Sequence, residues 1–225
     1  ASRAGIELFV LDDGWFGKRN NDESSLGDWK VNLDKLPNGL NGLAERINEL
    51  GMKFGLWFEP EMISIDSDLY REHPDWAIHI EGRLPIYSRE QLVLDLTKQE
   101  VCDYIIDSVS SILESANITY VKWDMNRNIT NIPEGLANDQ RFEFHHRYML
   151  GLYRVLAHLT KRFPDILFES CAGGGGRNDL GIMYYMPQAW ASDDTDAIER
   201  LSIQEGTSLI YPPSSIGAHV SAVPN

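Results

Sequence analysis

The sequence is poor in cysteine, has no long hydrophobic run and carries relatively few basic residues. Only two cysteines, Cys102 and Cys171, occur in 225 residues, and their number and spacing fit neither a disulfide framework nor a metal site. They indicate reduced thiols in a reducing compartment, so we expect a cytoplasmic protein. No run approaches the roughly 18 apolar residues of a membrane-spanning helix, and no signal peptide is recognisable at the start.

The shortage of positive charge argues against two classes of partner. Lys and Arg number 20 against 34 Asp and Glu, which gives a formal net charge of −14. Binding to nucleic acid or to an anionic membrane surface needs clustered Lys and Arg, so we expect neither partner. Histidines with zinc-ligand spacing are also lacking. The prediction is therefore a protein that needs no metal and no cofactor.

Strands and helices alternate along the chain. Its 43% hydrophobic content over 225 residues suffices for one large domain. Helical apolar spacing begins near Leu40 and recurs over about 98–115 and 140–161. The β-rich runs that we expect to form strands are IELFVLDD, KFGLWFEPE, QLVLDL, ITYVKWD, DILFESC, PQAWASDD and TSLIYP. This alternation predicts an α/β fold with a parallel sheet, either doubly wound and open or closed as a (β/α)₈ barrel.

The polar residues at the strand ends favour the barrel. Acidic residues follow at least four predicted strands: Asp12 and Asp13, then Glu59, then Asp124, then Asp193 and Asp194. In a barrel all of these ends converge on one mouth, where active sites lie. In an open sheet only the ends near the switch point would meet.

Lys122 and Asp124 are two residues apart on a predicted strand. Side chains alternate along a strand, so these two share a face and Trp123 takes the other. A neighbouring ammonium favours an ionised carboxylate, and a positioned carboxylate is a possible nucleophile. The alternative is a structural ion pair without chemistry.

A second carboxylate cluster lies in WASDDTDAIER. Thr195 or Asp196 is a candidate N-cap for the helix that follows. One of Asp193 and Asp194 should face the barrel mouth, but strand parity leaves open which. Two carboxylates from different strands are the minimum apparatus for glycoside hydrolysis, and they also suit a divalent metal.

A run of glycines and several aromatics complete the pattern. The four glycines of FESCAGGGGRN allow close backbone approach to a ligand, but they complete neither a phosphate loop nor GxGxxG. Trp15, Phe16 and Trp57 lie beside acidic residues, an arrangement that suits the apolar faces and hydroxyl rim of a sugar. Core packing is the alternative for each aromatic, and a flexible turn for the glycines.

Five motifs occurring in order give the sequence a recognisable likeness. LDDGWFG, GLWFEPEM, VKWDMNR, FESCAGGGGR and WASDDTDAIERL closely resemble bacterial α-galactosidases of glycoside hydrolase family 36, and the likeness extends over the whole chain. It implies that residues 1–225 are a fragment of the catalytic (β/α)₈ barrel, truncated at one or both ends. The flanking N- and C-terminal β domains of such enzymes, and the first barrel strand, are then absent.

The resemblance also implies a reaction and roles for individual residues. Terminal α-1,6-linked galactose would be removed from raffinose-type sugars with retention of configuration. Asp124 matches the nucleophile and Asp193 the acid/base. Galactose-contacting positions match Asp12, Asp13, Trp57, Arg89, Lys122, Cys171, Gly173 and Gly174. Members of the family are often tetramers, so we expect a homo-oligomeric parent protein.

Three alternatives remain at this level. A galactosyltransferase of the raffinose- or stachyose-synthase type would share the nucleophile and use a sugar acceptor. A non-catalytic galactose-binding barrel would bind without turnover. A metal-dependent barrel hydrolase would be sensitive to chelators, although the histidine ligands that it would use are lacking.

Overall fold

The predicted parallel sheet is present. The computed structural model describes residues 1–80, 82–133, 136 and 138–221; the final residues of the tail, 222–225, lie outside the described part. Five parallel strands run in the order β1-β2-β5-β6-β7. They are β1 (Leu8–Leu11), β2 (Lys53–Phe58), β5 (Tyr120–Trp123), β6 (Leu167–Ser170) and β7 (Gln188–Ala189). The order never reverses, unlike that of a doubly wound sheet.

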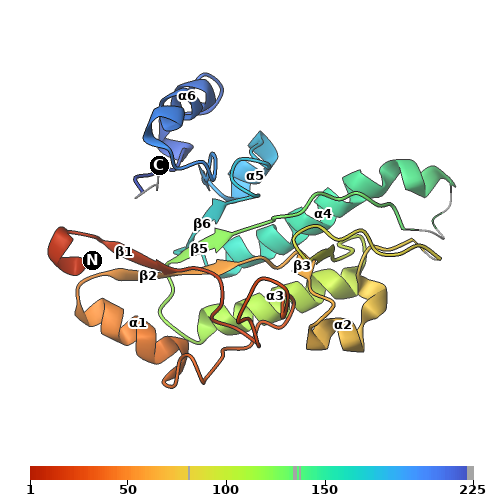
Figure 1. Cartoon of the computed structure of the whole chain (residues 1–225), viewed down its shortest axis with the longest axis horizontal. Helices are drawn as coiled ribbons and strands as arrows, with labels where there is room; N and C mark the ends of the chain where they lie inside the picture. Colours follow the sequence, from red (N-terminus) through yellow and green to blue (C-terminus); the bar gives the residue numbers. More distant parts are fainter. Residues whose placement is uncertain (81, 134–135, 137, 222–225) are drawn as a thin grey trace.

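Helices connect the strands, as in other parallel sheets. The three predicted helices are confirmed as α1 (Gly39–Glu49), α3 (Gln99–Glu114) and α4 (Asn138–Arg162). The helix expected after Asp196 is confirmed as α6 (Ala197–Ser208), whereas the short helices α2 (Asp68–Glu72) and α5 (Leu180–Tyr185) were not predicted. Short 3₁₀ turns occupy Ser2–Ala4, Pro74–Trp76 and Pro213–Ser215. Figure 1 shows α1 and α3 together beneath the strands, and α4 packs against α3.

The two faces of the sheet differ in chemistry because side chains alternate along each strand. One face is apolar, and its residues are buried against the helices: Phe54, Leu56, Phe58, Val121, Trp123 and Phe168. On the other face, the register aligns Trp57 with Lys122, Lys122 with Glu169, and Glu169 with Gln188. We call this second side the polar face. It carries the row of side chains from which the candidate site is built.

One predicted strand is wrong and another lies outside the parallel sheet. The short strand predicted in QLVLDL is present as β4 (Leu92–Val93), but it pairs antiparallel with β3 (Met62–Ile63) instead of joining the parallel sheet. TSLIYP is not a strand, because α6 continues through Ser208 and its last turn is closed by N–H groups bonding back to Gly206 and Thr207. Short apolar runs do not distinguish strand from helix by pattern alone. Here the Asp196 cap starts a helix that runs on into this segment.

The described residues do not close a barrel, but the sheet continues beyond β7. Ile216 forms a parallel bridge with Ala189, and the N–H of Gly217 donates to the carbonyl of Ala189 at 2.9 Å. The predicted fold class is therefore confirmed as α/β with a parallel sheet, extended at this edge by a further parallel contact.

Candidate active site

The predicted site residues gather at the carboxyl edge of the sheet. Asp12 directly follows β1, Asp124 follows β5 and Cys171 follows β6. The carboxyl ends of parallel strands lie on one edge of a sheet, so these residues were expected to be neighbours. Hydrogen bonds and contacts between the strand ends show that they are.

Asp124 is the most firmly held of these carboxylates. It is 6% exposed. Its Oδ2 accepts hydrogen bonds from Trp57 Nε1 at 3.1 Å and from Asn126 Nδ2 at 2.6 Å, and its Oδ1 accepts from the N–H of Met125 at 2.9 Å. Its own N–H continues the sheet by donating to Phe58. With donors on both oxygens and backbone pairing behind it, the carboxylate has one fixed orientation.

Lys122 shares the polar face with Asp124, as predicted, but its ion pair is with a different acid. Its Nζ lies 2.9 Å from Asp12 Oδ2, across the sheet at the end of β1. Burial alone lowers the pKa of the Lys122 ammonium, yet the bond and charge of Asp12 hold that pKa above its ordinary value, with Asp124 a more distant contributor. The proposed Lys122–Asp124 ion pair is thus replaced by Lys122–Asp12, because the Asp124 oxygens face Trp57 and Asn126.

Asp13 and Arg89 occupy the surroundings of the site in different ways. Asp13 is bound by the buried Arg19, whose Nη2 lies 2.8 Å from Asp13 Oδ2, so its carboxylate is fixed to the loop after β1. Arg89 is exposed and its backbone is left-handed, with φ +54°. The charge of Arg89 lowers the pKa of the buried Glu59, against the larger effects of burial and Asp124 that raise it.

The glycine-rich loop after β6 packs against protein backbone. The N–H of Gly173 donates to Asn126 Oδ1 at 3.1 Å, which joins the loop to the β5 end. Gly174 has φ +83°, and a Cβ there would lie 2.6 Å from the backbone nitrogen of Asp193. The glycines thus allow close approach to the protein segment after β7, while their approach to a ligand stays a prediction. Beside them, Cys171 is buried, and burial followed by the Asp124 charge raises the pKa of its thiol.

The structure distinguishes Asp193 from Asp194. Trp190, two residues beyond Gln188, lies on the polar face, and Lys122 Nζ is 5.7 Å from its ring centre. Asp193 Oδ1 accepts from Trp190 Nε1 at 2.9 Å. Asp194 instead accepts the N–H of Asp196, which caps α6 as predicted. Asp193 is thus tied to the polar face and Asp194 to the turn into the helix.

Two residues of the site received no role from the sequence. Asn126 bridges Asp124 and Gly173 through its two amide atoms. Glu59, 1% exposed, accepts the N–H of Asn126 at 2.6 Å. Burial, then the neighbouring Asp124 charge, raises the pKa of Glu59 to about 8. Alternation along β2 puts Glu59 on the same side as Trp57, so this signal was available.

The interpretation of Trp15 and Phe16 as a sugar platform is wrong. Both are at most 2% exposed, and their rings pack edge to face with centres 5.2 Å apart. Trp29 and Phe58 complete this aromatic cluster, and Trp15 Nε1 donates to the carbonyl of Trp57. These aromatics therefore pack against the carboxyl end of β2 as part of the core. Of Trp15, Phe16 and Trp57, it is Trp57 that contacts a candidate catalytic group, through its hydrogen bond to Asp124.

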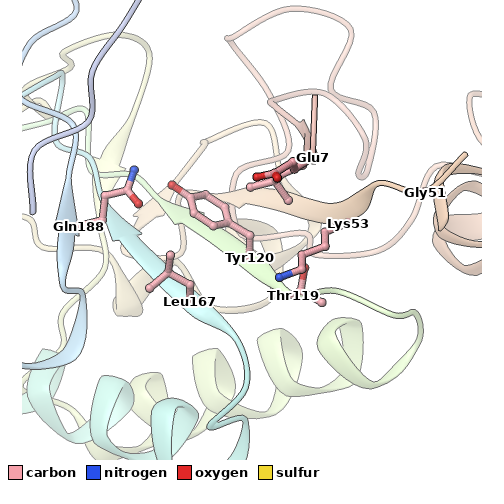
Figure 2. A pocket seen from close by; sticks show the side chains of 8 residues that line it. Glu7, Gly51, Lys53, Thr119, Tyr120, Leu167 and Gln188 are labelled. Carbon is pink, nitrogen blue, oxygen red and sulfur yellow. The ribbon is translucent and has the colours of Figure 1, made fainter. Parts of the chain in front are cut away.

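A cavity of about 570 Å³ opens at the opposite edge of the sheet (Figure 2). Its lining comes from the amino ends of the strands and includes Lys53, Tyr120 and Gln188. Tyr120 donates to Glu169 at 2.5 Å on the polar face. The cavity therefore lies at the amino-terminal side of the Lys122 row, away from the candidate site.

The described residues contain no group of three or more His, Cys, Asp or Glu side chains placed to hold a metal ion. Nor does any helix among them have the length and apolar character required to cross a bilayer.

Comparison with known proteins gives consistent matches. Two curated relatives match along the whole chain: α-galactosidase AgaA of Geobacillus stearothermophilus, 63% identical, and α-galactosidase Mel36A of Lactobacillus acidophilus, 58% identical. The chain spans 31% of the length of each. It superposes on the crystal structure of the GH36 α-galactosidase AgaA with a TM-score of 0.96, covering 100% of this chain and 31% of that one.

Other solved structures extend the comparison. An AgaA variant in complex with raffinose matches with a TM-score of 0.97 at 62% identity, over 100% of this chain and 31% of that one. The α-galactosidase of Lactobacillus brevis matches with a TM-score of 0.96 at 57% identity, over 99% of this chain and 30% of that one. The Melibiase family model matches residues 1–225. The chain therefore belongs to the melibiase family.

Proposed function

We propose that this chain is the central catalytic part of a longer retaining α-galactosidase. The observation that carries this proposal is the joining of Asp124 and Asp193 at one sheet edge, through Asn126 and the loop at Gly173 and Gly174. Two positioned carboxylates are the minimum apparatus for glycoside hydrolysis. The curated relatives AgaA and Mel36A are named α-galactosidases, and AgaA variants have been crystallised with raffinose and with stachyose.

We infer that the sheet is part of a (β/α)₈ barrel in the longer protein, with the polar face inside. Three observations support closure. The five strands are parallel and in sequence order, the apolar face packs against the helices, and Ile216 begins a further parallel contact. A barrel would place the site at its carboxyl-terminal mouth. We also propose that the longer protein carries flanking N- and C-terminal β domains and forms a homotetramer in the cytoplasm.

The remaining site residues would bind the galactosyl unit. Asp12 and Lys122, paired at 2.9 Å, offer an acceptor and a donor side by side for sugar hydroxyls. The ion pair with Arg19 fixes the orientation of the Asp13 carboxylate, which would accept a further sugar hydroxyl. The other proposed contacts come from Trp57, Arg89, Cys171, Gly173 and Gly174.

The proposed reaction has two displacements. An oxygen of Asp124 attacks the anomeric carbon as the bond to the leaving oxygen breaks, and Asp193 gives its proton to that oxygen. Water then attacks the same carbon, the ester to Asp124 breaks, and Asp193 takes the proton. This route requires the two carboxyl groups to be about 5–5.5 Å apart. The fixed orientation of Asp124 serves the attack, because a positioned nucleophile needs little reorganisation.

The experiment that tests the function measures p-nitrophenyl α-galactoside hydrolysis by the full-length protein and by its Asp124→Ala variant. We expect turnover by the parent and a loss on the order of 10⁴-fold or more in the variant, because no nucleophile remains. Added azide should restore nitrophenol release and give β-galactosyl azide. Failure of the parent on this substrate would refute the proposal, and near-full activity of the variant would refute the nucleophile.

The transferase alternative is separated in the same assay. With excess acceptor sugar, a hydrolase releases mainly free galactose, whereas a transferase forms a longer oligosaccharide. The curated relatives AgaA and Mel36A are named α-galactosidases, so hydrolysis is the reaction that we propose.

A further inference from the structure

A buried carboxyl group that the mechanism does not use lies directly behind the proposed nucleophile. Glu59 follows β2 and is 1% exposed. The N–H of Asn126 donates to its Oε1 at 2.6 Å, and Gln91 Nε2 donates to its Oε2 at 3.2 Å. No lysine or arginine within the described residues forms an ion pair with it. A buried carboxyl with such partners is expensive to keep charged.

The bond from Asn126 is the important one, since it fixes the turn that carries Asp124. Asn126 is two residues after Asp124, and its side chain donates to Asp124 Oδ2 while accepting from Gly173. Glu59 therefore holds the backbone of a residue whose side chain joins the nucleophile to the glycine loop. Moving the Asn126 backbone would shift both contacts together.

We propose that Glu59 is a positioning residue for Asp124, acting as a hydrogen-bond acceptor that fixes the 124–127 turn through Asn126. This inference rests on the proposed function for its link to catalysis. It does not assign Glu59 any contact with substrate.

The charges around Glu59 are consistent with a neutral acid. Asp124 faces it from the β5 end and disfavours its ionisation, whereas Arg89, from the loop before β4, acts in the opposite direction. Arg127, from the same turn as Asn126, bonds to the carbonyl of Gln91 at 2.7 Å and so braces the second partner of Glu59. Burial and the Asp124 charge together outweigh the Asn126 hydrogen bonds and the Arg89 charge, so the pKa of Glu59 rises.

Three variants of the full-length protein test the proposal by kcat and KM on p-nitrophenyl α-galactoside. Glu59→Gln keeps an acceptor oxygen and should retain kcat within about threefold. Glu59→Ala removes the acceptor, and a misplacement of about 1 Å can cost roughly 10²-fold, so kcat should fall at least tenfold with little change in KM. The matched control is Asp28→Asn: Asp28 also accepts two backbone N–H groups, from Asp68 and Leu69, but at α2. Its kcat should equal the parent value.

Two results would overturn the inference while the parent remains active. One is a parent-like kcat in Glu59→Ala. The other is an equal loss in Glu59→Gln and Glu59→Ala, which would assign the effect to the acidic proton or charge of Glu59. An inactive parent would instead refute the proposed function.

A crystal structure of Glu59→Ala tests the positioning without any activity. We expect the Asn126 backbone and the Asp124 carboxylate to move from their parental positions. The hydrogen bond from Asn126 Nδ2 to Asp124 Oδ2, 2.6 Å in the parent, should lengthen. An unchanged site would contradict the inference whatever the enzyme does.

Discussion

Asp193 and Asp194 are adjacent in the chain, yet the structure gives their side chains different partners. Asp193 is bound to Trp190 on the polar face, and Asp194 to the first turn before α6. Neutralising Asp194 as Asp194→Asn preserves an acceptor for the Asp196 N–H, whereas Asp193→Ala removes the proposed proton donor. Only the second change should affect the chemistry.

We therefore expect Asp193→Ala to lose far more activity on raffinose than on p-nitrophenyl α-galactoside. Nitrophenolate leaves readily without a proton, but a sugar alkoxide does not. Added azide should yield α-galactosyl azide in this variant, because attack then occurs on the galactosyl-enzyme. Steady-state rates on both substrates check the expectation, with Asp194→Asn as the control. A larger loss in the control would reverse the assignment.

The buried Glu59 carboxyl also predicts how stability depends on pH. Its folded-state pKa is about 8 against an ordinary value of 4.5, so between these pH values the folded protein holds a proton that the unfolded chain has lost. Its contribution to stability is present below about pH 4.5 and is lost as pH rises toward 8, at about 1.4 kcal/mol per unit.

Glu59→Gln cannot titrate, so its stability relative to the parent should increase steadily from pH 5 to pH 8. Denaturant unfolding of the two full-length proteins at several pH values measures this difference. Glu23→Gln, at an exposed carboxylate, is the control and should parallel the parent. A constant gap between Glu59→Gln and the parent would show that Glu59 is ionised in the folded state throughout this range.

At the scale of elements, the glycine loop after β6 is the piece that brings two strand ends together. Gly174→Ala would place a Cβ 2.6 Å from the backbone nitrogen of Asp193, at a residue with φ +83°. Both the clash and the backbone strain oppose the native loop. We expect the variant to lose at least tenfold in kcat while remaining folded, because residues 191–193 must move away.

The matched control for this change is Gly206→Ala. Gly206 lies within α6, and a Cβ there would meet nothing within 4 Å. Alanine in a helix interior is favoured over glycine by about 0.5–1 kcal/mol, so this variant should be slightly more stable and fully active. Parent-like kcat in Gly174→Ala, measured beside this control, would show that the loop does not position Asp193.

The long, periodic elements could be predicted from sequence, and the contacts between side chains could not. The apolar spacing of α1, α3 and α4 and the alternation along β5 predicted their positions and the shared face of Lys122 and Asp124. The partner of Lys122 could not be read in the same way, because Asp12 is 110 residues away and meets it only through strand order. Alternation alone did not show which face of the sheet carries Trp190. The register of β7 with β6, which pairs Gln188 with Glu169, places it on the polar face. The assignment of TSLIYP as a strand failed because helix capping at Asp196 outweighed a short apolar run.

At the scale of the whole molecule, the open edge at β1 bears on barrel closure. Among the described residues β1 pairs only with β2, and Ile6 and Phe9 at this edge are 48% and 38% exposed. Every second N–H of an edge strand in a parallel sheet faces away from its one neighbour. In a closed barrel another strand would cover these groups, since closure removes all edges.

Hydrogen exchange at residues 6–13 therefore tests the barrel directly. In the full-length protein we expect slow exchange at both alternating sets of β1 amides, because strands would flank β1 on both sides. In the 225-residue chain alone, the β1 amides that bond to β2 should exchange more slowly than the β1 amides that face away from β2. The residues of β5, which lie between β2 and β6, provide the internal reference, protected in both samples if the sheet is folded. Fast exchange of the outer β1 amides in the full-length protein, beside a protected β5, would mean that the sheet stays open and that the site lies on an open α/β sheet.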